Sequence, residues 1–429
     1  MAEAGNQYAL LWRWHFYAGL IIAPYAGLII APVLIIMSVT GGMYLLQPQI
    51  EDALYGELLY LPDPHAGPVD HDALITTATT RLEAARLHAY TPPQGPEHSA
   101  AVDLTTQTGD RLTAYLSPAT GDILGTVAED WRPMTLARKI HGGLMLGKPG
   151  DVIVELVACW TLVMVATGLF LWWPRKSRAV GTALPRANIR GRAFWRDWHA
   201  VPGAWAGLWI AAIIVTGLPW SILWGGAYAA IGKATGEGLP AAIFTERPHS
   251  VSDAATPDIT MNELIARITA QDVPLAYKIE YPWFANGVYA VMPLRQIGQA
   301  EDMAYLFIDR RSGAVLTDLR WDDLGALGRA STIGVQFHEG RLFGPANQII
   351  NLAAILILIA LALTGPVMWW KRRPKGKLAP PVVPRDTRLS IGVLTIATAL
   401  ALILPLFALS VLLIVAGEWV WARRTAANA

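Results

Sequence analysis

The chain has 429 residues, of which 53% are hydrophobic and 16% charged, with 34 Lys and Arg against 33 Asp and Glu. The balanced charge excludes a nucleic-acid binder driven by bulk positive charge, and the apolar composition excludes a disordered chain. The single cysteine, Cys159, excludes an intramolecular disulfide scaffold. The class that remains is a membrane protein.

Uncharged runs predict five transmembrane helices. They cover residues 16–46, 152–173, 200–231, 342–370 and 389–417, and the only interruption is Glu155, near the start of the second run. Each run exceeds the roughly 20 residues that a helix needs to cross a bilayer. Because a carboxyl within a membrane span is a functional candidate by default, Glu155 is a candidate for proton transfer.

The charge of the connecting segments predicts the orientation. Residues 174–199 and 371–388 each carry seven basic residues and one acidic residue, whereas residues 47–150 and 232–341 are more acidic than basic. By the positive-inside rule the two basic segments are cytoplasmic and the two long segments periplasmic. We therefore expect a multi-pass protein of the bacterial inner membrane, with a cytoplasmic N-terminus and an external C-terminus.

These boundaries divide the chain into nine segments. They are an N-terminal tail with the first helix (1–46), a first periplasmic domain (47–150), the second helix (151–173), a basic loop (174–198), the third helix (199–231), a second periplasmic domain (232–341), the fourth helix (342–370), a second basic loop (371–388), and the fifth helix with the C-terminal tail (389–429).

The two halves of the chain resemble each other. His141-Gly142-Gly143 matches His338-Glu339-Gly340 at an offset of 197, and Trp14-His15 matches Trp198-His199 at an offset of 184. Thr-Gly pairs recur inside the first four helices. The sequence therefore predicts a duplicated helix–(α+β domain)–helix unit, with two parallel repeats related by a pseudo-two-fold axis along the membrane normal.

The periplasmic segments repeat as well. Residues 115–124 align with 307–316 at an offset of 192, each reading as two strands around a Thr-Gly or Ser-Gly turn. Helix-like stretches at 71–88 and 261–270 precede them. In the first helix YAGLIIAP occurs twice in succession, at 17–24 and 25–32, so the level of His15 depends on where the extra turns lie.

Four of the nine histidines form two repeat-related pairs at helix ends. His15 and His199 open the first and third helices on the inner side, while His141 and His338 precede the second and fourth on the outer side. Imidazole is a suitable ligand for iron, and a pseudo-two-fold axis would oppose the two rings of a pair. Axial ligation of two haem groups is the functional interpretation. The alternative is that these rings are interfacial side chains, a frequent place for amphipathic residues.

Haem propionates are anionic and favour arginine partners. Arg132 and Arg329 are equivalent in the repeat and precede the outer histidines. We expect both to bind the cofactor.

The paired order of these motifs resembles the PepSY-associated transmembrane family over about residues 10–375. The motifs are Trp-His opening helices one and three, His-x-Gly before helices two and four, the Thr-Gly pairs, and the turn from Asp309 to Gly313. The family comprises iron-regulated inner-membrane proteins that are implicated in reducing ferric siderophores. The resemblance therefore implies two PepSY-like periplasmic domains, and haem-ligand roles for His15, His141, His199 and His338. The Asp of the turn is replaced by Ser117 in the first domain.

The expected function is therefore a haem-dependent oxidoreductase of the ferric-chelate reductase type. It would contain two b haems and carry electrons from an unidentified cytoplasmic or membrane donor to a periplasmic ferric siderophore. One alternative is a non-enzymatic PepSY module that restrains a periplasmic protease or sensor. Another is a siderophore or haem transporter. No dinucleotide-binding motif occurs in the sequence, so a nicotinamide or flavin donor would have to be a separate partner.

Overall fold

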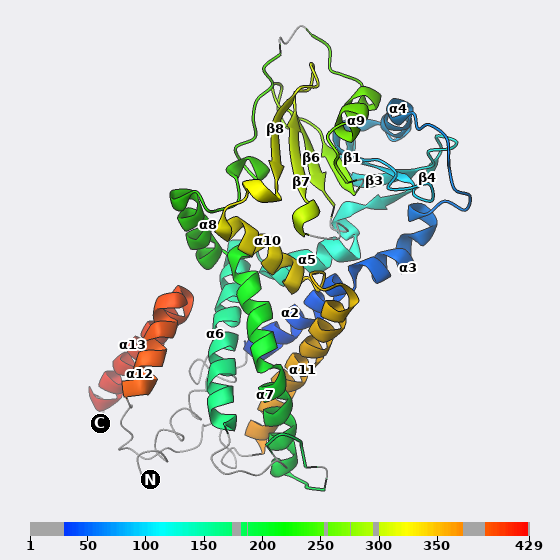
Figure 1. The fold of residues 1–429 in the computed structure, drawn as a ribbon. Helices are drawn as coiled ribbons and strands as arrows, with labels where there is room; N and C mark the ends of the chain where they lie inside the picture. Colours follow the sequence, from blue (N-terminus) through cyan, green and yellow to red (C-terminus); the bar gives the residue numbers. More distant parts are fainter. Residues whose placement is uncertain are drawn as a thin grey trace. The chain divides into compact units, whose positions relative to one another are not determined.

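The structure is a computed structural model that describes residues 30–173, 182–186, 188–252, 256–274, 276–294, 300–371 and 391–427. It divides into two compact units (Figure 1). The helical unit contains Met1–Leu45, Ala137–Tyr228 and Phe337–Ala429, and the sheet unit contains Leu46–Leu136 and Ala229–Gln336. Each unit thus collects segments from both halves of the chain.

Four long apolar helices build the helical unit. They are α2 (Ile30–Leu45), α6 (Lys148–Trp172), α7 (Arg192–Gly217) and α11 (Gly344–Trp370). α11 packs against both α7 and α2, and α6 packs against α7 and more lightly against α2. Many apolar side chains on these helices face outward, such as Leu208 with 73% of its surface exposed. An apolar exterior is expected of helices that lie in lipid.

The number of spans differs from the sequence prediction. Among the described residues, three helices are long and apolar enough to cross a membrane: Lys148–Trp172, Arg192–Trp220 and Gly344–Trp370. A fourth span results if α2 and α3 (Gln47–Leu59), which are bent at their junction, count together. The prediction of five spans is therefore not confirmed, whereas a multi-pass helical membrane protein is.

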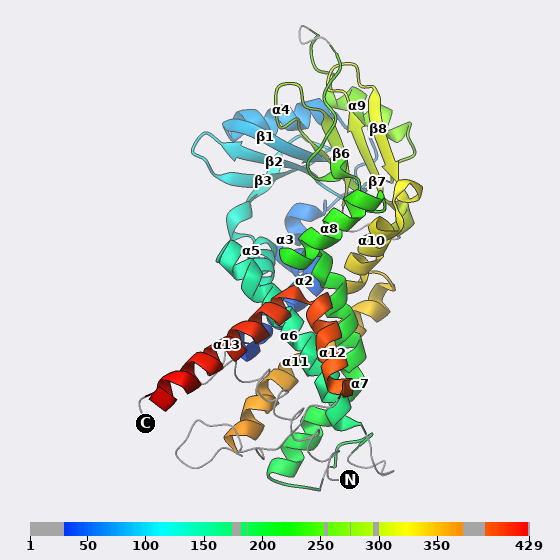
Figure 2. The same cartoon turned by 90° about the vertical axis from the view of Figure 1, so that its left-hand side faces the viewer.

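The predicted fifth helix is broken in the structure. It forms α12 (Ile391–Ile403) and α13 (Pro405–Ala427), in which the described stretch Pro405–Gly417 is apolar. A helix of 13 residues is about 20 Å long, too short for a hydrocarbon layer of about 30 Å. In both views the two helices meet at one end and their open ends point the same way (Figures 1 and 2). They form a hairpin.

Two indole N–H groups hold this hairpin near its tip. Trp224 Nε1 donates to the carbonyl of Ile403 over 3.0 Å, and Trp160 Nε1 donates to Ser410 Oγ over 3.1 Å. Leu404 is buried at the break, where Pro405 removes a helical hydrogen bond. The tip therefore lies against α6 and α8 (Leu223–Thr235), and the C-terminal end returns toward the side from which α12 begins.

This hairpin predicts that the C-terminus faces the cytoplasm, contrary to the external C-terminus expected from five spans. Green fluorescent protein, which fluoresces only when it folds inside the cell, should be bright when fused after Ala429 and equally bright when fused after Lys371. Alkaline phosphatase should be inactive at both positions. Opposite signals at the two positions would mean that residues 391–427 cross the membrane.

The sheet unit contains one antiparallel sheet of eight strands in the order β4-β3-β2-β1-β5-β6-β7-β8. The strands are β1 (Ala84–Thr91), β2 (Ala100–Thr106), β3 (Arg111–Leu116), β4 (Ile123–Ala128), β5 (Tyr277–Glu280), β6 (Tyr289–Pro293), β7 (Ala304–Ile308) and β8 (Val315–Arg320). β1 pairs with β5, with Tyr90 opposite Ile279. The two segments that the sequence predicts to be periplasmic therefore share one sheet.

The same strand pairing recurs in both halves of the sheet. Leu116 pairs with Ile123 after a register shift, and Ile308 pairs with Val315 after the same shift. The strands predicted around the Thr-Gly and Ser-Gly turns are confirmed.

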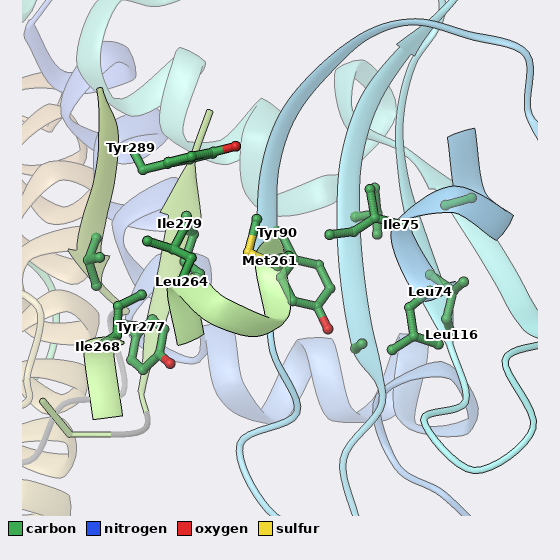
Figure 3. Close-up of a cluster of buried hydrophobic side chains, with 14 of the residues drawn as sticks. Leu74, Ile75, Tyr90, Leu116, Met261, Leu264, Ile268, Tyr277, Ile279 and Tyr289 are labelled. Atoms are coloured by element: carbon green, nitrogen blue, oxygen red, sulfur yellow. The ribbon is translucent and has the colours of Figure 1, made fainter. Parts of the chain in front are cut away.

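Two helices cover one face of this sheet, α4 (His71–Arg81) and α9 (Met261–Thr269). Leu74, Leu264 and Ile268 from these helices pack with Tyr90 and Ile279 of the central strands (Figure 3). The N-termini of the helices cap each other: the Asp72 carboxylate accepts from the backbone N–H of Met261 and Asn262, while Asn262 Oδ1 accepts from the N–H of His71. These hydrogen bonds join the two halves of the chain.

The helix predicted at 71–88 is wrong in its second part. α4 ends at Arg81, Glu83 adopts a left-handed φ of 48°, and β1 begins at Ala84. The residues from Leu82 to Leu87 favour a helix locally, but β1 is a central strand whose backbone groups pair with β2 on one side and β5 on the other. The pairing of Ala84, Arg86 and Leu87 with β2 outweighs a helix propensity of a few tenths of a kcal/mol per residue.

Asp309, in the β7–β8 turn, is fully buried and ties a distant segment to the sheet. Its carboxylate accepts hydrogen bonds from the hydroxyls of Ser250 and Ser252, at 2.8 and 2.7 Å, and from the backbone N–H of Arg311 and Ser312. Burial by itself would raise the pKa of Asp309, but the hydrogen bonds from Ser312, Ser252 and Ser250 outweigh it and hold the pKa below its ordinary value.

We expect Asp309→Ala to destabilise the sheet unit by about 2–4 kcal/mol, since it leaves several donors without an acceptor. A depressed pKa stabilises the folded state above the unfolded-state pKa of about 3.9, and this contribution is lost as the pH falls further. The difference between wild type and variant in thermal unfolding of the full-length protein should therefore be large at pH 7 and shrink below pH 4. Ser117→Ala, at the equivalent turn, is the control, because the Ser117 hydroxyl accepts only a 3.4 Å bond from Thr120 N–H. Equal effects of the two substitutions would contradict this role.

Candidate functional site

The outer histidine of the first half lies near the end of α5 (Pro133–Gly143). His141 Nδ1 is 2.9 Å from the carbonyl oxygen of Met37 and 3.3 Å from Thr40 Oγ1, both on α2. The ring also lies against the backbone of Gly41, where an added Cβ would be 3.0 Å from Cε1 of the ring. The helix backbone thus fixes the position of the imidazole.

The outer histidine of the second half is held in the same way. His338 is the last residue of α10 (Ala326–His338), and its Nδ1 is 2.7 Å from the carbonyl oxygen of Ile213 on α7. A Cβ on Gly217 would be 2.9 Å from Cε1 of the ring. In the sequence alignment of the first and third helices, Met37 and Gly41 correspond to Ile213 and Gly217.

These contacts determine the tautomer of both rings. A backbone carbonyl can only accept a hydrogen bond, so the proton of each neutral imidazole is on Nδ1. Nε2 then keeps its lone pair, and a histidine whose other nitrogen donates to a carbonyl is the usual form of a metal ligand. In this tautomer Nε2 is the nitrogen through which His141 and His338 could bind a metal.

The structure brings His141 and His338 together. Their ring centres are 6.2 Å apart and their planes meet at 67°. A first-row metal bonded to one nitrogen of each ring at about 2 Å, with that nitrogen about 1 Å from its ring centre, would separate the centres by about 6 Å. A direct edge-to-face ring pair has a similar spacing, so the distance fits both a metal held between the rings and direct contact of the rings. Within the described residues no cluster of three or more His, Cys, Asp or Glu could hold a metal ion.

His199, on α7, has a comparable hydrogen bond at its Nδ1. His199 Nδ1 is 2.8 Å from Thr364 Oγ1 on α11. The Thr364 hydroxyl donates its own hydrogen to the carbonyl of Ala360, 2.7 Å away, so it accepts from Nδ1–H and leaves the lone pair on Nε2. A Cβ on Gly365 would lie 4.0 Å from this ring. His15, the predicted partner of His199, lies outside the described residues.

Sequence reasoning missed how these rings are held. In the sequence the Thr-Gly pairs were treated as a recurring motif, whereas in the structure several of them contact the histidines. The contacts are Thr40 and Gly41 at His141, Gly217 at His338, and Thr364 and Gly365 at His199. The recurring Thr-Gly pairs were the signal in the sequence that could have revealed these contacts. No sequence signal identifies the accepting carbonyls of Met37 and Ile213, because every residue has a carbonyl.

Arg132 and Arg329 belong to the sheet unit, where both already have partners. Arg132 is 2.8 Å from Glu129 Oε1, 3.3 Å from Glu51 Oε1, and donates to Tyr115 Oη. Arg329 donates to the backbone carbonyls of Leu324 and Asp322. These hydrogen bonds hold both guanidiniums in place within the sheet unit. The binding of haem propionates by Arg132 and Arg329 stays a prediction.

Glu155 has a structural role. It is fully buried on α6, and its carboxylate accepts from the backbone N–H of Leu223 at 2.7 Å and of Trp224 at 3.1 Å. These are the first residues of α8, whose N–H groups lack partners within the helix. The negative charge thus caps the positive end of a helix dipole.

Comparison with known proteins gives one family. The sequence model described as the PepSY-associated TM region matches residues 12–372, the greater part of the chain. No curated protein matches the chain.

Proposed function

The chain belongs to the PepSY-associated TM region family, and from this premise we propose that it is a haem-containing reductase of the bacterial inner membrane. The reductase would pass electrons from the cytoplasmic side to a ferric siderophore in the periplasm. The observation that carries the proposal is the pair His141 and His338, with 6.2 Å between ring centres and both Nδ1 atoms bonded to backbone carbonyls.

The residues of the chain fit two haem sites. His141 and His338 would hold the outer haem, and His199, with His15 as its repeat partner, would hold the inner one. Haem b supplies a reversible one-electron couple, whose potential depends on its axial ligands and their hydrogen bonds. The carbonyls of Met37 and Ile213 orient the outer rings and make Nε2 more basic. The glycines beside the rings have no side chain, so the rings can lie close to the helix backbone.

The helix α7 connects the two levels. It carries His199 near its inner end and, 14 residues later, the Ile213 carbonyl that holds His338. This separation corresponds to about 21 Å along a helix, most of the hydrocarbon thickness. The arrangement supports stepwise transfer through two sites at different depths, one near each membrane surface.

The direction of transfer follows from the charges of the connecting segments. The basic segments 174–198 and 371–388 favour the cytoplasm, which gives an N-terminus inside and a sheet unit in the periplasm. A donor on the cytoplasmic side loses one electron for each Fe(III) that is reduced to Fe(II) in the chelate. No bond to the protein forms or breaks. The siderophore binds Fe(II) more weakly than Fe(III), so reduction releases the metal.

We also propose that the two halves arose by duplication, with parallel repeats around an axis normal to the membrane. The equal hydrogen bonding of His141 and His338 and the equal register of the two halves of the sheet support this. An axis of this kind would place equivalent ligands at equal depth.

Purified full-length protein from cells supplied with haem tests the function. We expect a Soret band, two haems per chain by pyridine haemochrome assay, and reoxidation of the dithionite-reduced protein by a ferric hydroxamate or catecholate. Reoxidation should be followed by Fe(II) capture by ferrozine. Protein that is folded but has no Soret band would end the reductase proposal, and protein with haem that no ferric chelate reoxidises would end the choice of substrate.

A further inference from the structure

A second layer of side chains surrounds the backbone next to His338. Asn351, on α11, is 1% exposed, and its Nδ2 donates to the carbonyls of Phe337 at 2.8 Å and His338 at 3.3 Å. These are the last two carbonyls of α10, and no N–H group of the same helix follows to donate a hydrogen bond to them. The Asn351 amide therefore closes the helix end that presents the histidine.

The orientation of this amide is fixed by its neighbours. Trp209 Nε1 donates to Asn351 Oδ1 over 2.8 Å, and Asn347 Nδ2 donates to the same oxygen over 3.1 Å. An indole N–H can only donate, so the oxygen must face Trp209 and the nitrogen must face α10. The Trp209 ring also packs on Phe337, with centres 5.0 Å apart. Every hydrogen-bonding position of the Asn351 amide is used.

The first half of the chain lacks this layer. At the offsets of the repeat, Gly150, Val154 and Val33 stand where the second half has Asn347, Asn351 and Trp209. The end of α5 is closed by backbone contact instead, since a Cβ on Gly150 would be 1.8 Å from the carbonyl oxygen of Gly143. His141 and His338 thus have like bonds to Nδ1 and unlike support behind their backbones.

We infer that Asn351, oriented by Trp209, is a positioning residue for His338 and makes the two axial ligands of the outer site inequivalent. This inference rests on the proposed function. The amide holds the His338 backbone, and through it the ring, by hydrogen bonds that Val154 cannot make at the equivalent position. In a medium of low dielectric the four hydrogen bonds of the Asn351 amide are strong and directional.

The test is Asn351→Val, which installs the residue found at the equivalent position of the first half. We expect the low-spin ferric EPR signal of the outer haem to shift in g value, and its midpoint potential to rise because a looser imidazole stabilises the ferric state less. The inner haem should keep both its signal and its potential. Trp209→Phe, which keeps the ring and removes the N–H, should shift the same signal in the same direction by a smaller amount.

Val154→Ala is the matched control, because it changes the equivalent position on α6 without touching an amide. It should leave the outer potential unaltered. An Asn351→Val protein with two haems and wild-type g values and potentials would overturn the inference while leaving the reductase intact.

Hydrogen exchange followed by mass spectrometry tests the same inference without haem. In haem-free protein, Asn351→Val should speed exchange of the amides at the end of α10, including Gly340, whose N–H bonds to the Phe337 carbonyl. Loss of two hydrogen bonds predicts about a tenfold increase, with no change around His141. Unchanged exchange there would overturn the positioning role even if wild-type protein proves to bind no haem, an outcome that would separately end the proposed function.

Discussion

Replacing His141 or His338 with alanine should reduce the bound haem from two per chain to one. In the proposed function each ring would supply one ligand nitrogen to the outer haem, and each Nδ1 is hydrogen-bonded to a backbone carbonyl, which leaves Nε2 as the ligand nitrogen. The Soret absorbance per protein should fall by half, and the remaining low-spin EPR signal should be that of the inner site. Reduction of ferric chelates should be lost even though half of the haem remains, because in the proposed function the outer haem would be the one that passes electrons to the acceptor.

The double variant in which both histidines are alanine should bind the same single haem as either variant alone, since both residues serve one site. His88→Ala is the control. His88 lies on β1 of the sheet unit and bonds to Thr105, so its loss should not alter the haem ratio. A ratio of two in the His141→Ala protein would contradict the assignment of this ligand.

Substituting Gly41 or Gly217 with valine should also empty the outer site, although neither residue can bind a metal. A Cβ would lie 3.0 Å from the His141 ring in the first case and 2.9 Å from the His338 ring in the second. Because the added side chain is anchored on a helix backbone, the ring has to move, and its bond to the Met37 or Ile213 carbonyl is strained or broken. We expect a loss of outer haem approaching that of the histidine variants, with alanine at either position giving a partial loss.

Gly42→Val is the matched control, one residue further along the same helix. A Cβ on Gly42 would meet only Ile355, at an ordinary 3.8 Å. The haem ratio of this variant should remain two. If Gly41→Val and Gly42→Val lose haem equally, the effect comes from the stability of α2, and the contact with His141 has no special importance.

Several features follow from the sequence by itself. The long apolar runs determine the membrane class because few other structures can accommodate so many uncharged residues in succession. The strands around Thr120-Gly121 and Ser312-Gly313 follow from local alternation and turn chemistry. Comparison of the halves isolated four histidines, and the paired motifs indicated the family that the match over residues 12–372 shows.

Other features were decided only by contacts between residues far apart in the chain. Residues 84–87 read as helix but form a strand, because they pair with β2 in the sheet. The Met37 and Ile213 carbonyls, which set the histidine tautomers, are chemically identical to every other carbonyl until folding places them at a ring. The sequence determines which side chains are present and how they alternate locally. The hydrogen-bond partner of each polar group is set by three-dimensional packing. In this protein that partner determines which imidazole nitrogen is available to act as a ligand.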